Sequence, residues 1–210
     1  MKTIITTFLF VLSFCTNSIH AQKNNLQNQE IPIVWLGIDY SHVKFIGSAT
    51  GWGDESTKTE IEIRDKYFRE WNDLLIDKAE YFKLEEAVNR KTVERNTEMV
   101  RKINANAEYK NIFSESNEDY QLLDKETVLK FIKKYNFPKK DAIGFLLVAE
   151  GMSKPLKEGS YWAVFIDLKS KEVLAIHRID GKASGFGFKN YWAGTIKSVF
   201  KSMIKSFKHW

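Results

Sequence analysis

Residues 142–149, Ala-Ile-Gly-Phe-Leu-Leu-Val-Ala, decide the fold of this 210-residue chain. A run of eight residues without a charge predicts a strand that is buried on both faces, because an exposed face would show alternating polar residues. Residues 33–38, Ile-Val-Trp-Leu-Gly-Ile, repeat this composition and predict a second buried strand. Strands of this kind need helices packed over the sheet, so we expect an α/β protein.

The pattern continues on the C-terminal side of the central strand. Residues 151–159 read as a loop, and the strand-like runs 161–168 and 172–179 are joined by only three polar residues, which predicts a β-hairpin. After a glycine-rich segment, apolar residues recur at helical spacing and predict a last helix from about Tyr191 to Phe207.

The N-terminal half predicts helices around the same sheet. Helical spacing covers residues 59–80, and Asp124 is expected to cap a helix that runs to Tyr135. Residues 40–46 either extend the first strand or form another, and residues 81–107 leave both a helix and a short edge strand open. We therefore expect residues 31–210 to form a single α/β domain: a mixed β-sheet with a C-terminal β-hairpin and helices packed on the sheet.

The first 21 residues predict that the protein is exported. A positive start at Lys2 is followed by an apolar run over residues 4–14 and by a cleavage point between Ala21 and Gln22. This is the layout of a secretory signal peptide, because a membrane anchor needs about twenty apolar residues. Residues 22–30 are polar and predict a flexible leader. We expect an exported protein, periplasmic or extracellular, and its Asn-, Lys- and Ile-rich composition suggests a bacterial source.

Cleavage at this point would remove the only cysteine, Cys15. The mature chain would then have no disulfide, no cysteine nucleophile and no thiolate metal site. Lipidation of Cys15 is an alternative, but it needs a small preceding residue and Phe14 is bulky. The mature chain would carry 31 basic and 27 acidic side chains, which is too mild an excess to favour nucleic acid.

The corner segment, residues 181–192, joins the predicted hairpin to the last helix. Its three glycines allow unusual backbone angles, Asn190 is placed to cap the helix, and free amides at a helix start attract anions. It matches neither a phosphate-loop nor a dinucleotide pattern. The alternative is a tight connection whose glycines let Phe186, Phe188 and Trp192 pack closely. The predicted ligand-binding residues are Lys182, Ser184, Gly185, Gly187, Lys189 and Asn190.

Residues 181–194, Gly-Lys-Ala-Ser-Gly-Phe-Gly-Phe-Lys-Asn-Tyr-Trp-Ala-Gly, resemble the C-terminal signature of a family of small exported bacterial proteins of uncharacterised function. In that family, as here, the segment follows a hairpin. The resemblance covers the region from about residue 161 to residue 210. It implies an envelope or secreted protein, and it carries no catalytic residue or cofactor to this chain.

Other candidate residues point to chemistry less specifically. His42, His177 and His209 lack the spacing of a zinc site, so no metal and no cofactor is expected. A Ser184–His177–Asp180 triad is not favoured, because residues so close in sequence rarely converge. Asp39 and Glu150 each end a predicted buried strand and are the best acid pair for an exported hydrolase.

Lys197, Lys201 and Lys205 repeat every four residues and form a basic stripe on the last helix. Such a stripe can dock on anionic lipid, on a polymer or on another protein, although most stripes of this kind are simply solvated. We favour a non-enzymatic binding or envelope-associated module whose partner is an envelope protein or an anionic ligand. The alternatives are the carboxylate hydrolase and an accessory subunit that docks through the stripe.

The export prediction has a direct test. Mass spectrometry of the protein recovered from its native host should give a mature chain that starts at Gln22, because the apolar run is too short to remain as an anchor. A diacylated Cys15, or a chain that retains Met1, would contradict this prediction.

Overall fold

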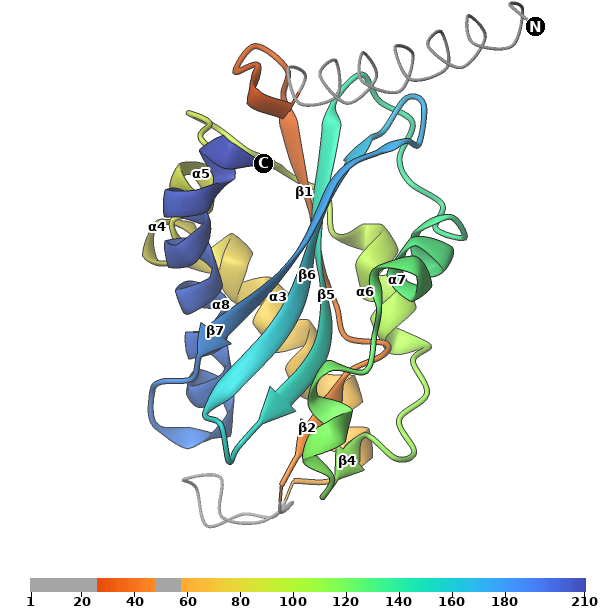
Figure 1. Cartoon of the computed structure of the whole chain (residues 1–210), viewed down its shortest axis with the longest axis vertical. Helices are drawn as coiled ribbons and strands as arrows, with labels where there is room; N and C mark the ends of the chain where they lie inside the picture. Colours follow the sequence, from red (N-terminus) through yellow and green to blue (C-terminus); the bar gives the residue numbers. More distant parts are fainter. Residues whose placement is uncertain (1–25, 48–57) are drawn as a thin grey trace, which may run out of the picture.

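The computed structural model describes residues 26–47 and 58–210 (Figure 1). The predicted signal peptide, the start of the predicted leader and residues 48–57 lie outside these ranges. The strands are β1 (Ile33–Asp39), β2 (Lys44–Ile46), β3 (Glu94–Arg95), β4 (Phe113–Ser114), β5 (Ile143–Ser153), β6 (Glu158–Asp167) and β7 (Val173–Lys182). The helical elements are α2 (Glu60–Glu62), the π-helical turn η1 (Ile63–Tyr67), α3 (Phe68–Asp77), α4 (Ala79–Phe82), α5 (Leu84–Ala87), α6 (Glu98–Ala105), η2 (Asn117–Gln121), α7 (Lys125–Ile132), α8 (Gly187–Ser206) and η3 (Phe207–His209).

Strand β5 is the centre of the sheet, and all of its residues are buried. Along one edge it pairs in parallel first with β1 and then, beyond a bulge, with β2. Along the other edge it pairs with β6 in antiparallel fashion, and β6 pairs with β7 in the same way. The short strand β3 pairs in parallel with β1, and the short strand β4 pairs in parallel with β2. This mixed sheet in one α/β domain confirms the predicted fold class.

Helices cover the two faces of the sheet (Figure 1). Helices α3, α4, α5 and α8 lie on one side, over a large apolar cluster rich in aromatic rings. Helix α7 covers the other face, where a smaller cluster includes Val128, Ile132, Val148 and Trp162. Within the described ranges, no helix is both long and apolar enough to cross a membrane.

The strands run further than the apolar runs predict. The predicted loop at residues 151–159 is mostly strand, because β5 continues to Ser153 and β6 begins at Glu158. Two acids at the ends of this stretch pair with β7: Glu150, just before it, accepts from Arg178, and Glu158 forms an ion pair with Lys182. The hairpin of β6 and β7 and the Asp124 N-cap are confirmed, and the Asp124 carboxylate accepts from the Thr127 amide at 2.7 Å.

The start of α8 differs from the prediction. The helix begins at Gly187, its N-cap is Phe186, and no side chain caps it. Asn190 lies within the first turn, where its Nδ2 donates to the Phe186 carbonyl at 3.1 Å. The predicted Asn190 cap is therefore wrong: Gly187 has a φ of +79° that lets the chain turn into the helix four residues earlier.

The second half of the predicted leader packs against the domain. The Leu26 side chain is buried, and Arg90 donates from Nη2 to the carbonyls of Leu26 and Asn28 at 3.0 and 2.8 Å. Gln27 donates from Nε2 to the Phe207 carbonyl at 2.8 Å. Residues 26–30 thus join the N-terminal end of the domain to its last turn.

Two asparagines complete the outer edge of β1. Strand β3 pairs only with Val34 and Trp35, so among the described residues the edge at Ile38 and Tyr40 has no neighbouring strand. Asn72 on α3 accepts from the Ile38 amide at 2.8 Å and donates to the Ile38 carbonyl at 3.0 Å.

Asn104 on α6 acts at the same edge. It accepts from the Tyr40 amide and donates to the Ile38 carbonyl, both at 2.8 Å. Gly37 makes room for this arrangement, because a Cβ there would lie 2.7 Å from the Asn72 Oδ1. The two side chains therefore replace a missing strand.

Replacing Asn72 tests how much its side chain contributes to stability at the edge of β1. We expect Asn72→Ala to lower the free energy of unfolding by about 2–4 kcal/mol, because it leaves the buried Ile38 amide without an acceptor. Urea denaturation measures the change. Asn136→Ala, at an exposed position, is the control and should change stability by less than about 0.5 kcal/mol. Equal stabilities for the two variants would contradict the role of Asn72.

Candidate functional site

The corner segment lies beside a pocket of about 420 Å³, which we call the corner pocket. It lies where the start of α8 meets the end of α3 and α4. Three of the six predicted ligand-binding residues line it: Ser184, Gly185 and Asn190. The remaining lining residues are Leu74, Lys78, Tyr81, Phe82, Ala193 and Gly194.

Some glycines of this region serve packing. A Cβ at Gly181 would lie 2.1 Å from the Thr195 carbonyl oxygen, and a Cβ at Gly194 would lie 2.3 Å from the Ser184 carbonyl oxygen. The loop backbone therefore lies directly on α8. Gly185 adopts a φ of +113°, which favours glycine, whereas a Cβ at Gly187 would meet no atom within 4 Å. The structural alternative thus accounts for the close approach of loop and helix, but it leaves the pocket beside them unexplained.

The two predicted lysines lie outside the pocket. Lys182 forms an ion pair with Glu158, and Lys189 forms one with Glu70 at 3.2 Å. The positive charge that lines the pocket comes from Lys78, between α3 and α4. Its side chain has no ion pair within residues 26–47 and 58–210. Sequence reasoning missed Lys78, because only the fold brings it to a loop more than a hundred residues away.

One exposed aromatic ring lines the corner pocket. Tyr81 is 56% exposed, and Phe186, which follows the lining residue Gly185 in the chain, is 82% exposed but does not line the pocket. The ammonium of Lys197 lies 3.5 Å from the centre of the Tyr81 ring, which joins the predicted basic stripe to the lining of the pocket. Phe188 and Trp192 are buried as the packing alternative expects, but Phe186 is not.

The acid pair Asp39 and Glu150 is buried on one face of the sheet. Asp39 is in register with Val148, two residues before Glu150 on the neighbouring strand. The Asp39 carboxylate accepts from the Tyr135 hydroxyl and from the Ser41 amide. Asp39 lies at the end of β1, where it contacts Tyr135 just after α7. It does not line the corner pocket.

Glu150 is held by a different set of donors. Its carboxylate accepts from Arg178 Nε and from the Ser160 hydroxyl, each at 2.7 Å, and from the Leu123 amide at 3.3 Å. The Arg178 guanidinium also lies 4.6 Å from the centre of the Trp162 ring. These contacts join β5, β6 and β7, so Glu150 holds neighbouring strands of the sheet together.

The histidines do not form the sequence-derived triad. His177 stacks on Trp210, with ring centres 4.4 Å apart, and burial lowers its pKa. Asp180 is three residues further along β7 and accepts instead from Gln121 Nε2 at 3.1 Å. Because residues three apart in a strand point to opposite faces, Asp180 cannot orient His177 toward Ser184.

His42 stacks on Phe131 with ring centres 3.7 Å apart, and burial lowers its pKa despite the nearby Asp39. Among the described residues, no group of three or more His, Cys, Asp or Glu side chains is arranged to hold a metal ion.

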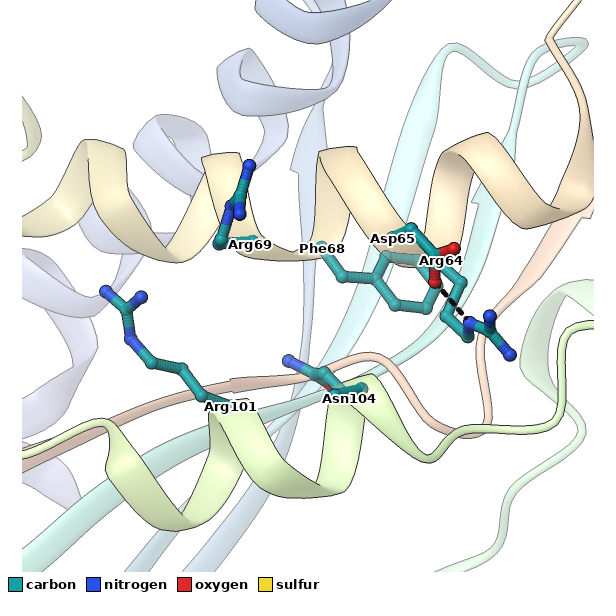
Figure 2. Close-up of a pocket in the computed structure, with 7 residues that line it drawn as sticks. Arg64, Asp65, Phe68, Arg69, Arg101 and Asn104 are labelled. Carbon is teal, nitrogen blue, oxygen red and sulfur yellow. Dashed lines mark hydrogen bonds and ion pairs between the residues drawn. The ribbon is translucent and has the colours of Figure 1, made fainter.

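A second pocket, of about 360 Å³, lies between η1–α3 and α6 (Figure 2). We call it the arginine pocket, because Arg64, Arg69 and Arg101 line it together with Asp65, Phe68, Asn104 and Ala105. Sequence reasoning missed it entirely: none of these residues stands in a recognisable motif, and two separate helices contribute them.

Comparison of the chain with protein-family models, with curated proteins and with solved structures gives no match.

The packing role of the corner glycines can be measured. We expect Gly194→Ala to lower the free energy of unfolding by about 2–3 kcal/mol, because the new methyl overlaps the Ser184 carbonyl. Gly187→Ala meets open space and should cost only about 1 kcal/mol of backbone strain. Chemical denaturation of both variants checks the order, and a larger loss for Gly187→Ala would contradict the described approach of loop and helix.

Proposed function

We propose that the protein is an exported, non-enzymatic binding module that holds a small hydroxylated anion in the corner pocket. The observation that supports this proposal most strongly is the corner pocket itself. It combines Ser184, Gly185 and Asn190 from the corner segment with Lys78 from the opposite wall. Export rests on the signal-peptide pattern of residues 1–21.

The polar groups of the pocket have bonding capacity to spare. Within the described ranges, the Ser184 hydroxyl makes no hydrogen bond, and the Asn190 side chain uses only its Nδ2, on the Phe186 carbonyl. Both side chains are exposed. A hydroxyl, an amide oxygen and the Lys78 ammonium together suit a ligand that carries both hydroxyl groups and a negative charge.

The size and rim of the pocket support a small molecule. A volume of about 420 Å³ falls within the usual range for small-molecule sites, roughly 300–1,000 Å³. The exposed ring of Tyr81 offers an apolar face among the lining residues. Anionic sugars such as uronates combine these requirements, because they carry hydroxyls, a carboxylate and an apolar ring face.

Binding explains the residues better than hydrolysis does. The best acid pair, Asp39 and Glu150, is buried and bonded by donors from neighbouring elements. A retaining or inverting hydrolase needs two carboxylates that face the substrate across a cleft. The corner pocket has no carboxylate among its lining residues, which suits an anion and disfavours general acid catalysis.

Titration with glucuronate, followed by amide chemical shifts, tests the proposal. We expect shifts at Ser184, Gly185 and Ala193, and weaker or no shifts with glucose at equal ionic strength, because Lys78 favours the carboxylate. Lys78→Gln should weaken glucuronate binding by about fivefold. Lys133→Gln, an exposed lysine on α7's side of the molecule, is the matched control and should leave binding unchanged.

Two results would contradict this proposal. One is glucuronate binding that is equal in Lys78→Gln and in the unaltered protein. The other is a set of shifts that avoids the lining of the corner pocket.

A further inference from the structure

The arginine pocket has an apolar floor that is rigidly held. Phe68 projects into the space between the two helices (Figure 2), and its ring stacks on Tyr40 with centres 4.9 Å apart. Ala105 and the buried Asn104 form the α6 side. Because the Asn104 amide bonds to the backbone of Ile38 in β1 and of Tyr40 just after it, this wall cannot move without breaking these hydrogen bonds.

Cationic groups stand at both ends of this floor. Arg101 is held on α6 by the Thr97 hydroxyl at 2.9 Å and by the Asp73 carboxylate. Arg64 is held by Asp65 at 2.6 Å, through Nε, and its guanidinium lies 4.2 Å from the centre of the Tyr109 ring. A guanidinium has five N–H donors, so each arginine keeps donors for a ligand.

Arg69 adds a third charge at the rim. It is exposed, its guanidinium points away from the pocket in Figure 2, and it has no ion pair within the described ranges. Asp65, Asp73 and Glu108 are the nearby acids, so positive and negative charges are equal in number around the pocket. The guanidinium groups still keep N–H donors, which a carboxylate can accept from.

A π-helical turn contributes to this arrangement. In η1 the Phe68 amide bonds to the Ile63 carbonyl, five residues back. The turn changes the helical period between Arg64, within η1, and Arg69, in the first turn of α3. Turns of this kind are frequent at functional sites.

We propose that the arginine pocket binds an amphiphilic monoanion, in which a carboxylate meets the Arg64 guanidinium and an apolar body covers Phe68 and Ala105. At about 360 Å³ the pocket is at the small end of ligand sites, which fits a medium-chain carboxylate. This site is separate from the corner pocket, and it does not depend on the function proposed there.

Calorimetric titration of the full mature chain with octanoate, octanol and acetate tests whether the carboxylate and the apolar chain of the ligand both contribute to binding. We expect octanoate to bind at least about tenfold more tightly than either octanol or acetate, because only octanoate uses both charge and apolar area. Ala105→Trp should abolish octanoate binding by filling the space. Ala105 is exposed, so this variant should keep the wild-type melting temperature, and Ala105→Ser is the matched control that should still bind.

Removing an acid and removing an arginine from the pocket should change octanoate affinity in opposite directions. Asp65→Asn should raise octanoate affinity about threefold to fivefold, because it releases Arg64 and removes a negative charge. Arg64→Gln should lower it by a similar factor. Lys133→Gln removes a charge elsewhere on the surface and should have no effect.

Lower affinity in Asp65→Asn, or octanol that binds as tightly as octanoate, would overturn the assignment of an anion. Octanoate binding that survives Ala105→Trp but is lost on changing Ser184 to Trp would place the ligand in the corner pocket instead and would also overturn the proposal.

Discussion

The fold and both pockets depend on the way α3 is fixed to the sheet. Asn72 on this helix bonds to the amide and the carbonyl of Ile38, at the edge of β1 that no strand within residues 26–47 and 58–210 covers. One residue earlier, Trp71 donates from its indole to the Lys189 carbonyl in the first turn of α8, at 2.9 Å. The helix is thereby attached to the sheet on one side and to α8 on the other. Its first residues form a wall of the arginine pocket, and Leu74 near its end lines the corner pocket.

Much of the fold could be predicted because it is encoded locally. The buried strands at residues 33–38 and 142–149 are continuous apolar runs, and Asp124 is followed by the helix that it caps. The extension of β5 beyond Ala149 could not be predicted, because Glu150 looks like the end of a strand until Arg178, 28 residues later, neutralises it. The earlier start of α8 was missed for a similar reason: Gly187 supplies the required φ, so no polar cap marks the boundary.

The residues of the candidate site also divide into those that a local sequence pattern indicates and those that only the fold brings together. Ser184, Gly185 and Asn190 were predicted because they stand in one unusual segment. Lys182 and Lys189 looked available in the sequence, but each meets a glutamate from another element, so their charges are compensated. Lys78 replaces them, and a single sequence gives no signal that it will lie there. The arginine pocket shows the limit most clearly, since its charges come from two helices separated by some thirty residues and from a π-turn that changes the helical period.

The central claim is that side-chain amides replace a strand at the open edge of β1, and native-state hydrogen exchange tests it most directly. The amides of Ile38 and Tyr40 should exchange as slowly as that of Leu147 in the middle of β5, to within about tenfold, because all three would open only in global unfolding. Exchange of the Ile38 and Tyr40 amides at rates typical of exposed loops would show that Asn72 and Asn104 do not hold this edge, and the basis for both pockets would be lost.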